Sequence, residues 1–168
     1  MTITQTRPSA PGTTVVRRAL LALTLAGICA TAFELASERH WNDVEQFIPW
    51  FALAVLAVAL LLVCLRSEPA HLVARALSVL VICASLYGVI DHAAVNHDSG
   101  PLDQRYAETW DAMPATEQWW LAITKAVGPA PTLAPGILAQ TALMLVLASL
   151  LRVRRPEDVA AGRVTADR

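Results

Sequence analysis

Apolar residues gather in four stretches of the chain, and shorter polar segments separate them. The uncharged runs cover residues 19–33, 47–65, 76–90 and 133–151. A helix needs about 20 residues to cross the roughly 30 Å hydrocarbon core of a bilayer. The second and fourth runs are long enough alone, and the first and third become so with flanking residues such as 35–36 and 93–95. No strand-like alternation competes, so the pattern predicts an all-α fold, an up-down bundle of four transmembrane helices.

The expected membrane domain covers residues 15–155, with spans at 17–37, 47–65, 73–95 and 132–152. The terminal segments, 1–14 and 156–168, are expected to be disordered tails. One alternative stays open for the first span. Residues 17–32 have the charged start, short apolar stretch and A-x-A end of a cleavable signal peptide, whereas the continuing apolar run at 35–36 favours a retained span.

The long connection between the third and fourth spans has a helical pattern of its own. Pro114 can open a helix that Gly128 closes, and its apolar side is formed by Trp119, Trp120, Ile123 and Val127. A helix of this kind lies in the plane of the membrane interface. We therefore expect an extra interfacial amphipathic helix that caps the bundle on its outer surface.

The cations indicate the orientation. Ten arginines lie in the two terminal segments, at the start of the first span and in the turn at 66–75, whereas the other two connections contain only Arg39, Arg105 and Lys125. Because cytoplasmic loops carry the excess of Lys and Arg, both termini are expected in the cytoplasm. All five tryptophans fall on the outer side, where an interfacial belt is expected: Trp41, Trp50, Trp110, Trp119 and Trp120.

Composition narrows the functional classes. The chain is 55% hydrophobic and 16% charged, against about 25% charged in soluble domains. Its net charge of −1 argues against nucleic acid as a partner. No nucleotide-binding or metalloprotease motif is present, and no nucleophile stands beside a base, so an enzymatic role is not expected.

Ionisable residues near the outer ends of the spans are the first candidates for a site, because burying them near hydrocarbon is costly. Glu34 lies 16 residues after Arg18, and Asp91 lies 16 residues after Arg75. On helices, each acid is then about 24 Å above its arginine. Spans one and three are diagonal in such a bundle, so their inward faces can meet.

The third span carries a small and polar stripe. Ser78, Ser85 and His92 recur every seven residues, with Gly88 and Asn96 one turn on either side of His92. Such stripes pack against other helices rather than lipid. The full set of candidate ligands is Glu34, His40, Asp91, His92, Asn96, His97, Glu108 and Gln140.

Two interpretations of these candidates stay open. Imidazoles with carboxylates suit Zn²⁺ or Cu²⁺, and paired histidines can hold haem iron. Alternatively, the acids reach interfacial water, or one pairs with His92 and locks the bundle. His92 and His97 are five residues apart, about 140° around a regular helix, so both can join one site only if the helix ends near Asn96.

Several motifs resemble those of a group of small, uncharacterised bacterial membrane proteins with four spans. They are His40-Trp41, the QFIP segment at 46–49, the spaced residues Gly88, His92 and Asn96, Glu108 in the outer connection, and PTLAPG at 131–136. The resemblance covers most of residues 34–140. It implies a retained first span and outer-face residues that the group shares, and it brings no activity with it. Separately, with the orientation above, the expected location is the bacterial inner membrane.

Two functions follow as hypotheses. In the first, an outward-facing acid and histidine pocket binds a metal ion, haem or a proton. In the second, the chain is a structural or accessory subunit that docks another membrane protein through its Trp-rich outer connection. The lipid bilayer is the expected environment in both.

Overall fold

The computed structural model describes residues 11–65 and 67–151, and within these ranges the chain is helical and contains no strand. The expected all-α class is therefore confirmed. The elements in chain order are α1 (Pro11–Ser37), α2 (Phe47–Cys64), α3 (Glu68–Ser99), the 3-10 turns η1 (Gly100–Leu102) and η2 (Trp110–Ala112), α4 (Ala115–Ile123) and α5 (Ala134–Leu150).

Three of these helices, α1, α2 and α3, are long and apolar enough to cross a membrane. Such helices indicate a lipid bilayer as the environment of the protein. The fourth apolar helix, α5, has 17 residues, which corresponds to about 26 Å. Proline stands in the first turn of α3 and of α5, where its missing N–H leaves no hydrogen bond unmade. Ser67 also caps α3, because its Oγ accepts from the Ala70 N–H at 3.1 Å.

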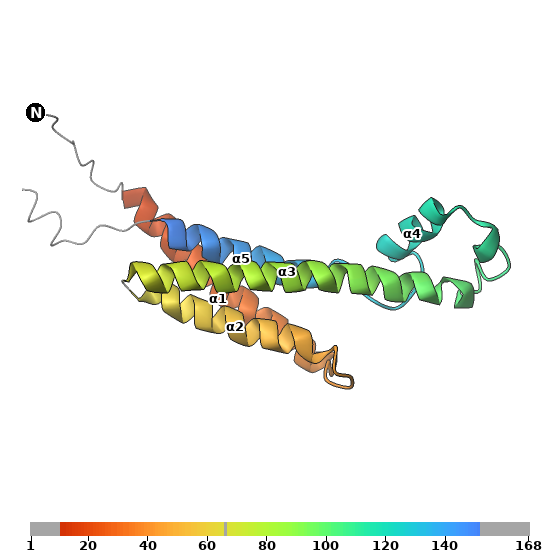
Figure 1. The fold of residues 1–168 in the computed structure, drawn as a ribbon, viewed down its shortest axis with the longest axis horizontal. Coiled ribbons are helices and arrows are strands. Elements are labelled where there is room, and N and C mark those ends of the chain that lie inside the picture. The colour runs from red at the N-terminus through yellow and green to blue at the C-terminus, as the bar shows by residue number, and fades with distance from the viewer. Residues whose placement is uncertain (1–10, 66, 152–168) are drawn as a thin grey trace, which may run out of the picture.

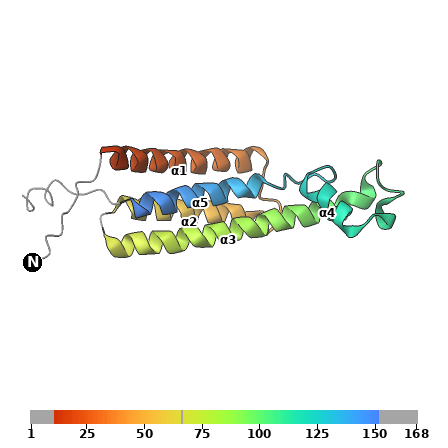
Figure 2. The ribbon, with the colours of Figure 1, turned by 90° about the horizontal axis from the view of Figure 1, so that it is seen from above.

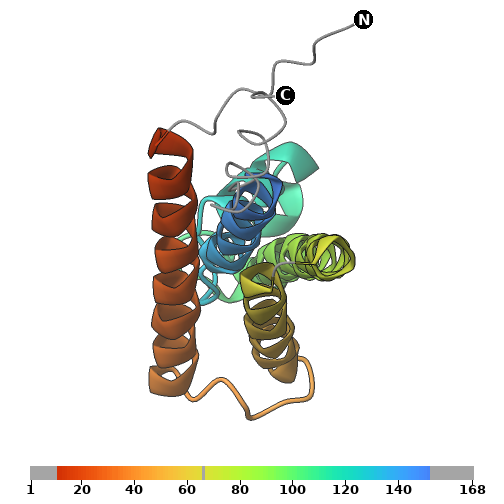
Figure 3. The same ribbon diagram turned by 90° about the vertical axis from the view of Figure 1, so that its left-hand side faces the viewer.

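The four long helices lie side by side in a bundle (Figure 2). Seen along the bundle, α1 and α3 lie on opposite sides, with α2 and α5 between them (Figure 3). The centre is closed by fully buried aliphatic side chains, among them Leu56 and Val63 of α2, Val81 of α3 and Leu145 of α5. We call the end where α1 stops and α2 starts the distal end, and the opposite end the proximal end.

The small and polar stripe of α3 lies in this packed interior. Ser78 and Ser85 are buried, and each Oγ donates back to the carbonyl four residues earlier, at 2.8 Å. Their hydroxyls are therefore satisfied within α3 and do not bridge helices. A Cβ on Gly88 would lie 3.0 Å from the Pro135 Cβ, so the stripe allows a close approach of α3 to α5.

Beyond the distal end, α3 continues alone and carries a small separate fold (Figure 1). We call residues 100–133 the distal lobe. Its core is made of Trp110, Ala122 and Val127, with Tyr106, Met113 and Leu121 packed around them. This lobe, rather than a loop over the bundle, is what the long third connection builds.

Two expectations differ from the structure at this level. The tail expected at 1–14 overlaps α1, which begins at Pro11; the rest of that tail and the one at 156–168 fall outside the described residues. The expected amphipathic helix ends at Ile123 rather than near Gly128, and it packs against the projecting part of α3 instead of capping the bundle (Figure 1).

Candidate functional site

His40 is placed by the way α1 ends. The His40 N–H donates to the Leu35 carbonyl at 2.9 Å, and the Arg39 N–H donates to the Ala36 carbonyl at 3.2 Å. This pair of bonds is a Schellman motif, and its left-handed position is Arg39, with φ of 51°. Glycine usually fills that position, so this turn could not be recognised from the residue type.

The His40 backbone is also anchored to α2. Trp50 donates its indole N–H to the His40 carbonyl at 2.7 Å, and the Trp41 and Trp50 rings lie 6.3 Å apart. A tryptophan near the start of α2 therefore fixes the turn that follows α1. His40 is half-buried against this turn.

His92 is fixed by the segment that leads into α5. Its Nδ1 lies 3.0 Å from the Pro131 carbonyl. A carbonyl oxygen only accepts, so Nδ1 carries the proton and the neutral ring keeps its lone pair on Nε2. Metal-binding histidines often have this kind of partner on the second nitrogen.

The two histidines influence each other. Burial lowers the pKa of His40 below its ordinary value of 6.5, the charge that His92 can carry lowers it further, and Glu38 opposes both. The α1–α2 turn and α3 therefore bring two of the predicted ligands into one neighbourhood. Nothing comparable joins the other candidates to them.

Asn96 has a structural role. Its side chain is fully buried and donates from Nδ2 to the carbonyls of Ala122 (3.1 Å) and Ala130 (2.8 Å) and to the Thr132 Oγ1 (3.1 Å). Its Oδ1 accepts from the Ala130 N–H at 2.8 Å. Both the NH2 group and the oxygen of the amide are therefore hydrogen-bonded within the protein, and these bonds hold the distal lobe to α3.

His97 belongs to the distal lobe rather than to a site with His92. Its ring stacks on Trp119 at 4.4 Å and meets the edge of Trp110 at 5.5 Å. Because α3 stays helical through Ser99, His92 and His97 point about 140° apart. The hypothesis that both rings join one site is therefore wrong.

The remaining candidates are not gathered. Glu34, Glu108 and Gln140 are exposed and Asp91 is half-buried, and none of these side chains makes a hydrogen bond or ion pair with another described residue. Across residues 11–65 and 67–151, no group of three or more His, Cys, Asp or Glu could hold a metal ion. The acids thus do not complete a ligand set around the two histidines.

The tryptophans differ in how far their side chains are exposed. Trp110 is only 3% exposed, because it fills the core of the distal lobe, whereas its place in an interfacial belt stays a prediction. Its ring packs against Gly100, where a Cβ would overlap it. Trp41, Trp119 and Trp120 are exposed.

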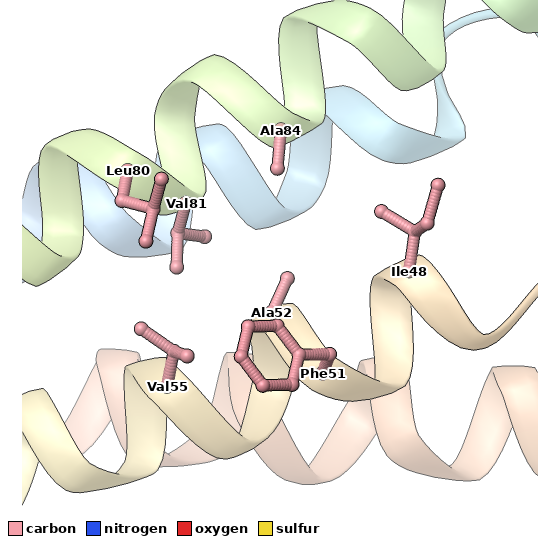
Figure 4. Close-up of a pocket in the computed structure, with 7 residues that line it drawn as sticks. All are labelled: Ile48, Phe51, Ala52, Val55, Leu80, Val81 and Ala84. Atoms are coloured by element: carbon pink, nitrogen blue, oxygen red, sulfur yellow. The ribbon is translucent and has the colours of Figure 1, made fainter. Parts of the chain in front are cut away.

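A cavity of the helix bundle lies away from the predicted ligands and is apolar. A groove of about 100 Å³ runs between α2 and α3 and is lined by Ile48, Phe51, Ala52, Val55, Leu80, Val81 and Ala84 (Figure 4). It contains none of the predicted ligands. With only hydrocarbon on its walls, it has no group that could orient a polar ligand.

Cationic side chains at the proximal end close the ends of neighbouring helices. Arg17 of α1 donates to the Val63 carbonyl at 2.8 Å, and Arg75 of α3 donates to Ser149 through both its Oγ (2.9 Å) and its carbonyl (3.0 Å). These are last-turn carbonyls of α2 and α5, which have no partner within their own helices. The sequence marked these arginines for orientation, but it did not reveal this capping role.

An ion pair between Arg105 and Asp103 stiffens the distal lobe. Arg105 donates to Asp103 from Nε (3.0 Å) and Nη2 (2.8 Å), and it also binds the Ala126 carbonyl. These side-chain bonds, with the Arg105 backbone N–H, lower the pKa of Asp103 to about 2. The loop between η1 and η2 is thereby tied to the end of α4.

Comparisons with protein-family models, curated proteins and solved structures find no match to this chain. Its chemistry therefore rests on the geometry above. At the distal end, His40 and His92 are close enough to influence each other electrostatically. Beyond it, the hydrogen bonds of Asn96 hold the distal lobe to α3.

Proposed function

We propose that the chain is a four-span integral protein of the bacterial inner membrane, with both termini in the cytoplasm. Its function is that of an accessory subunit that presents the distal lobe outside. Three helices of membrane-crossing length support the spans, and α5 approaches the thickness of the hydrocarbon core. The arginine distribution supports the orientation.

One observation carries the accessory role: a fully satisfied buried amide fixes a small folded lobe to a helix that extends past the bundle. Within that lobe Leu102 is 83% exposed, and Glu108 and Asp111 are exposed nearby in sequence. A rigid support for an exposed surface suits docking, because little conformational freedom is lost on binding. The scattered acids and Gln140 favour this role over a pocket built from all eight predicted ligands.

Photo-crosslinking in cells tests the docking role. A photoreactive phenylalanine derivative replaces Leu102 or Glu108 on the distal lobe, and exposed Leu61 in the last turn of α2 is the lipid-facing control. We expect one adduct of the same mass from both lobe positions and none from Leu61. Asn96→Ala should weaken the adduct, because it releases the lobe.

Two results would contradict docking: no adduct from either lobe position, or the same adducts from Leu61. The topology is tested separately. With the native cysteines replaced, an impermeant thiol reagent should label Glu108→Cys in intact cells and Arg18→Cys only after permeabilisation. Labelling of both from the same side would break the four-span proposal.

A second candidate function rests on His40 and His92, which could hold a metal ion, haem iron or a proton at the outer surface. The observation in its favour is the His92 Nδ1 contact with Pro131 beside a second imidazole. Elemental analysis and a visible spectrum of the purified full-length protein test it. Bound metal or a Soret band should disappear in His40→Gln and His92→Gln but persist in Gln140→Ala. A metal-free, colourless protein whose stability does not change when Zn²⁺ is added would leave only the accessory role.

A further inference from the structure

Asn96 brings three separate segments to one level of the molecule. Its amide binds Ala122 at the end of α4 and Thr132 before α5, while Asn96 itself is part of α3. The residue next to each of these in the sequence is an exposed aliphatic: Val95, Ile123 and Leu133. Each of the three segments that meet at this buried amide therefore carries an exposed apolar side chain.

This level coincides with the expected outer edge of the hydrocarbon core. Asn96 lies 21 residues after Arg75 on the same helix, about 31 Å at the rise of an α-helix. Arg75 binds the C-terminal end of α5, which marks the proximal edge. A bilayer core is about 30 Å thick, so Val95 and its neighbours lie where the acyl chains end.

The exposed side of α4 fits this position. Leu121 and Ala122 face the lobe core and Trp119 stacks on His97, whereas Trp120 is 66% exposed and Ile123 is 47% exposed. Tryptophan favours the membrane interface, where its ring is apolar and its N–H is wet. Lys125 follows directly, exposed, and an ammonium group near this level complements lipid phosphate.

We propose that Trp120 and Ile123 of α4, with Val95 and Leu133 beside them, contact the outer leaflet of the bilayer, while Lys125 reaches the phosphate layer. The distal lobe is thereby seated on the membrane surface, and its far side, around Leu102, stays free. This inference rests on the proposed membrane insertion. It concerns a different surface from the one tested by crosslinking.

Fluorescence quenching in nanodiscs tests the contact. The full-length protein is reconstituted in phosphatidylcholine and phosphatidylglycerol that carry bromine at a shallow or at a deep position of the acyl chain. We expect shallow bromines to quench more than deep ones, and Trp120→Phe to lose part of the shallow quenching. Trp110→Phe is the matched control: it removes a buried fluorophore, so the quenched fraction should rise.

Ile123→Lys provides a second variant that keeps Trp120. It should reduce the shallow quenching, because a charge replaces the apolar anchor beside the ring. The inference is overturned if the quenched fraction in Trp120→Phe equals or exceeds that of the wild type.

The two levels of the proposal can fail separately. If the bundle does not insert, bromines at neither depth quench any tryptophan, Trp41 and Trp50 included. If the bundle inserts but α4 stands clear of the lipid, quenching persists and the quenched fraction rises in Trp120→Phe, as it does in Trp110→Phe. The first result contradicts membrane insertion itself. The second contradicts only the contact of α4 with lipid and leaves insertion intact.

Discussion

Asn96 and Ala130 bind each other in both directions: the Asn96 Nδ2 donates to the Ala130 carbonyl, and the Ala130 N–H donates to the Asn96 Oδ1, both at 2.8 Å. The two residues are 34 positions apart. A side-chain amide here replaces the partner that a neighbouring strand or helix would give to Ala130. The chain between them is closed into the distal lobe by this pair.

Asn96→Ala should loosen the distal lobe. It leaves the part-buried N–H and carbonyl of Ala130 without partners, and an unsatisfied group of this kind costs at most about 1–3 kcal/mol. We expect a lower Tm and new protease cleavage within residues 103–133. Ser99→Ala is the control, because Ser99 lies about one turn further along α3 and its Oγ donates only to a carbonyl of the same helix. Equal stability of the two variants would contradict the role of Asn96 in holding the lobe to α3.

Two glycines of the same region should not tolerate a side chain. A Cβ on Gly100 would overlap the Trp110 ring, and Gly128 has φ of 76° and lies against Asn96. Gly100→Ala and Gly128→Ala are expected to lower the Tm and to change the near-UV circular dichroism of Trp110. Gly136→Ala meets open space in α5, so it should be neutral or add up to about 1 kcal/mol through helix propensity. A loss at Gly136 as large as at Gly100 would argue against the steric explanation.

Arg75→Gln should destabilise the bundle at its proximal end. The substitution removes charged hydrogen bonds to the last turn of α5, worth about 1–2 kcal/mol. Arg18→Gln removes the same charge from an exposed position and should change the thermal unfolding in nanodiscs much less. Because both variants lower the proximal charge equally, the difference between them measures capping rather than orientation.

Arg39→Gly should stabilise the end of α1. Arg39 has φ of 51° in a Schellman motif, and a side chain in this conformation costs roughly 1–2 kcal/mol. Glycine removes that cost but has more freedom in the unfolded chain, so we expect a net gain of at most about 1 kcal/mol. Chemical unfolding of the two proteins measures it, and a loss would show that the Arg39 side chain has a stabilising contact.

The stability of the protein should fall in acid because of His40. Its pKa is lowered from 6.5 in the folded protein, so the unfolded chain takes up this proton more readily. Above pH 6.5 His40 is neutral in both states, and its contribution to the stability is complete. The free energy of unfolding falls as the pH drops below 6.5, and the loss levels off once His40 is protonated in the folded protein as well.

Two variants should change this acid loss in opposite directions. His92→Gln removes the charge that repels protonated His40 and keeps a donor for the Pro131 carbonyl. The fall of Tm on acidification should therefore be smaller in this variant than in the wild type. Glu38→Gln removes the attraction that raises the pKa of His40, so the loss should grow. Parallel Tm profiles for all three proteins would show that His40 is not responsible.

The helices were predictable because each depends on a local run of residues. The second span was expected at 47–65 and is found at Phe47–Cys64, and the buried face of α3 was expected from Ser78 and Ser85. The ends were less predictable. Both α1 and α4 are followed two residues later by a non-glycine residue with positive φ, Arg39 and Lys125, whereas the helix at α4 was expected to close at Gly128.

The candidate site was predicted only in part. His40 and His92 were singled out and do come close enough to affect each other. The acids were expected beside them on the basis of depth alone, but equal depth does not set the direction of a side chain around its helix. Glu34 and Gln140 are exposed for this reason.

The sequence by itself determined the helical class and the apolar segments, because the thickness of a bilayer demands uninterrupted apolar runs that can be counted along the chain. Only the tertiary structure decided what the third connection becomes. Asn96 finds its partners 26, 34 and 36 positions away, and Trp110 is buried because Gly100 leaves room for its ring. Contacts at such separations depend on how the chain folds back on α3, which no local pattern specifies.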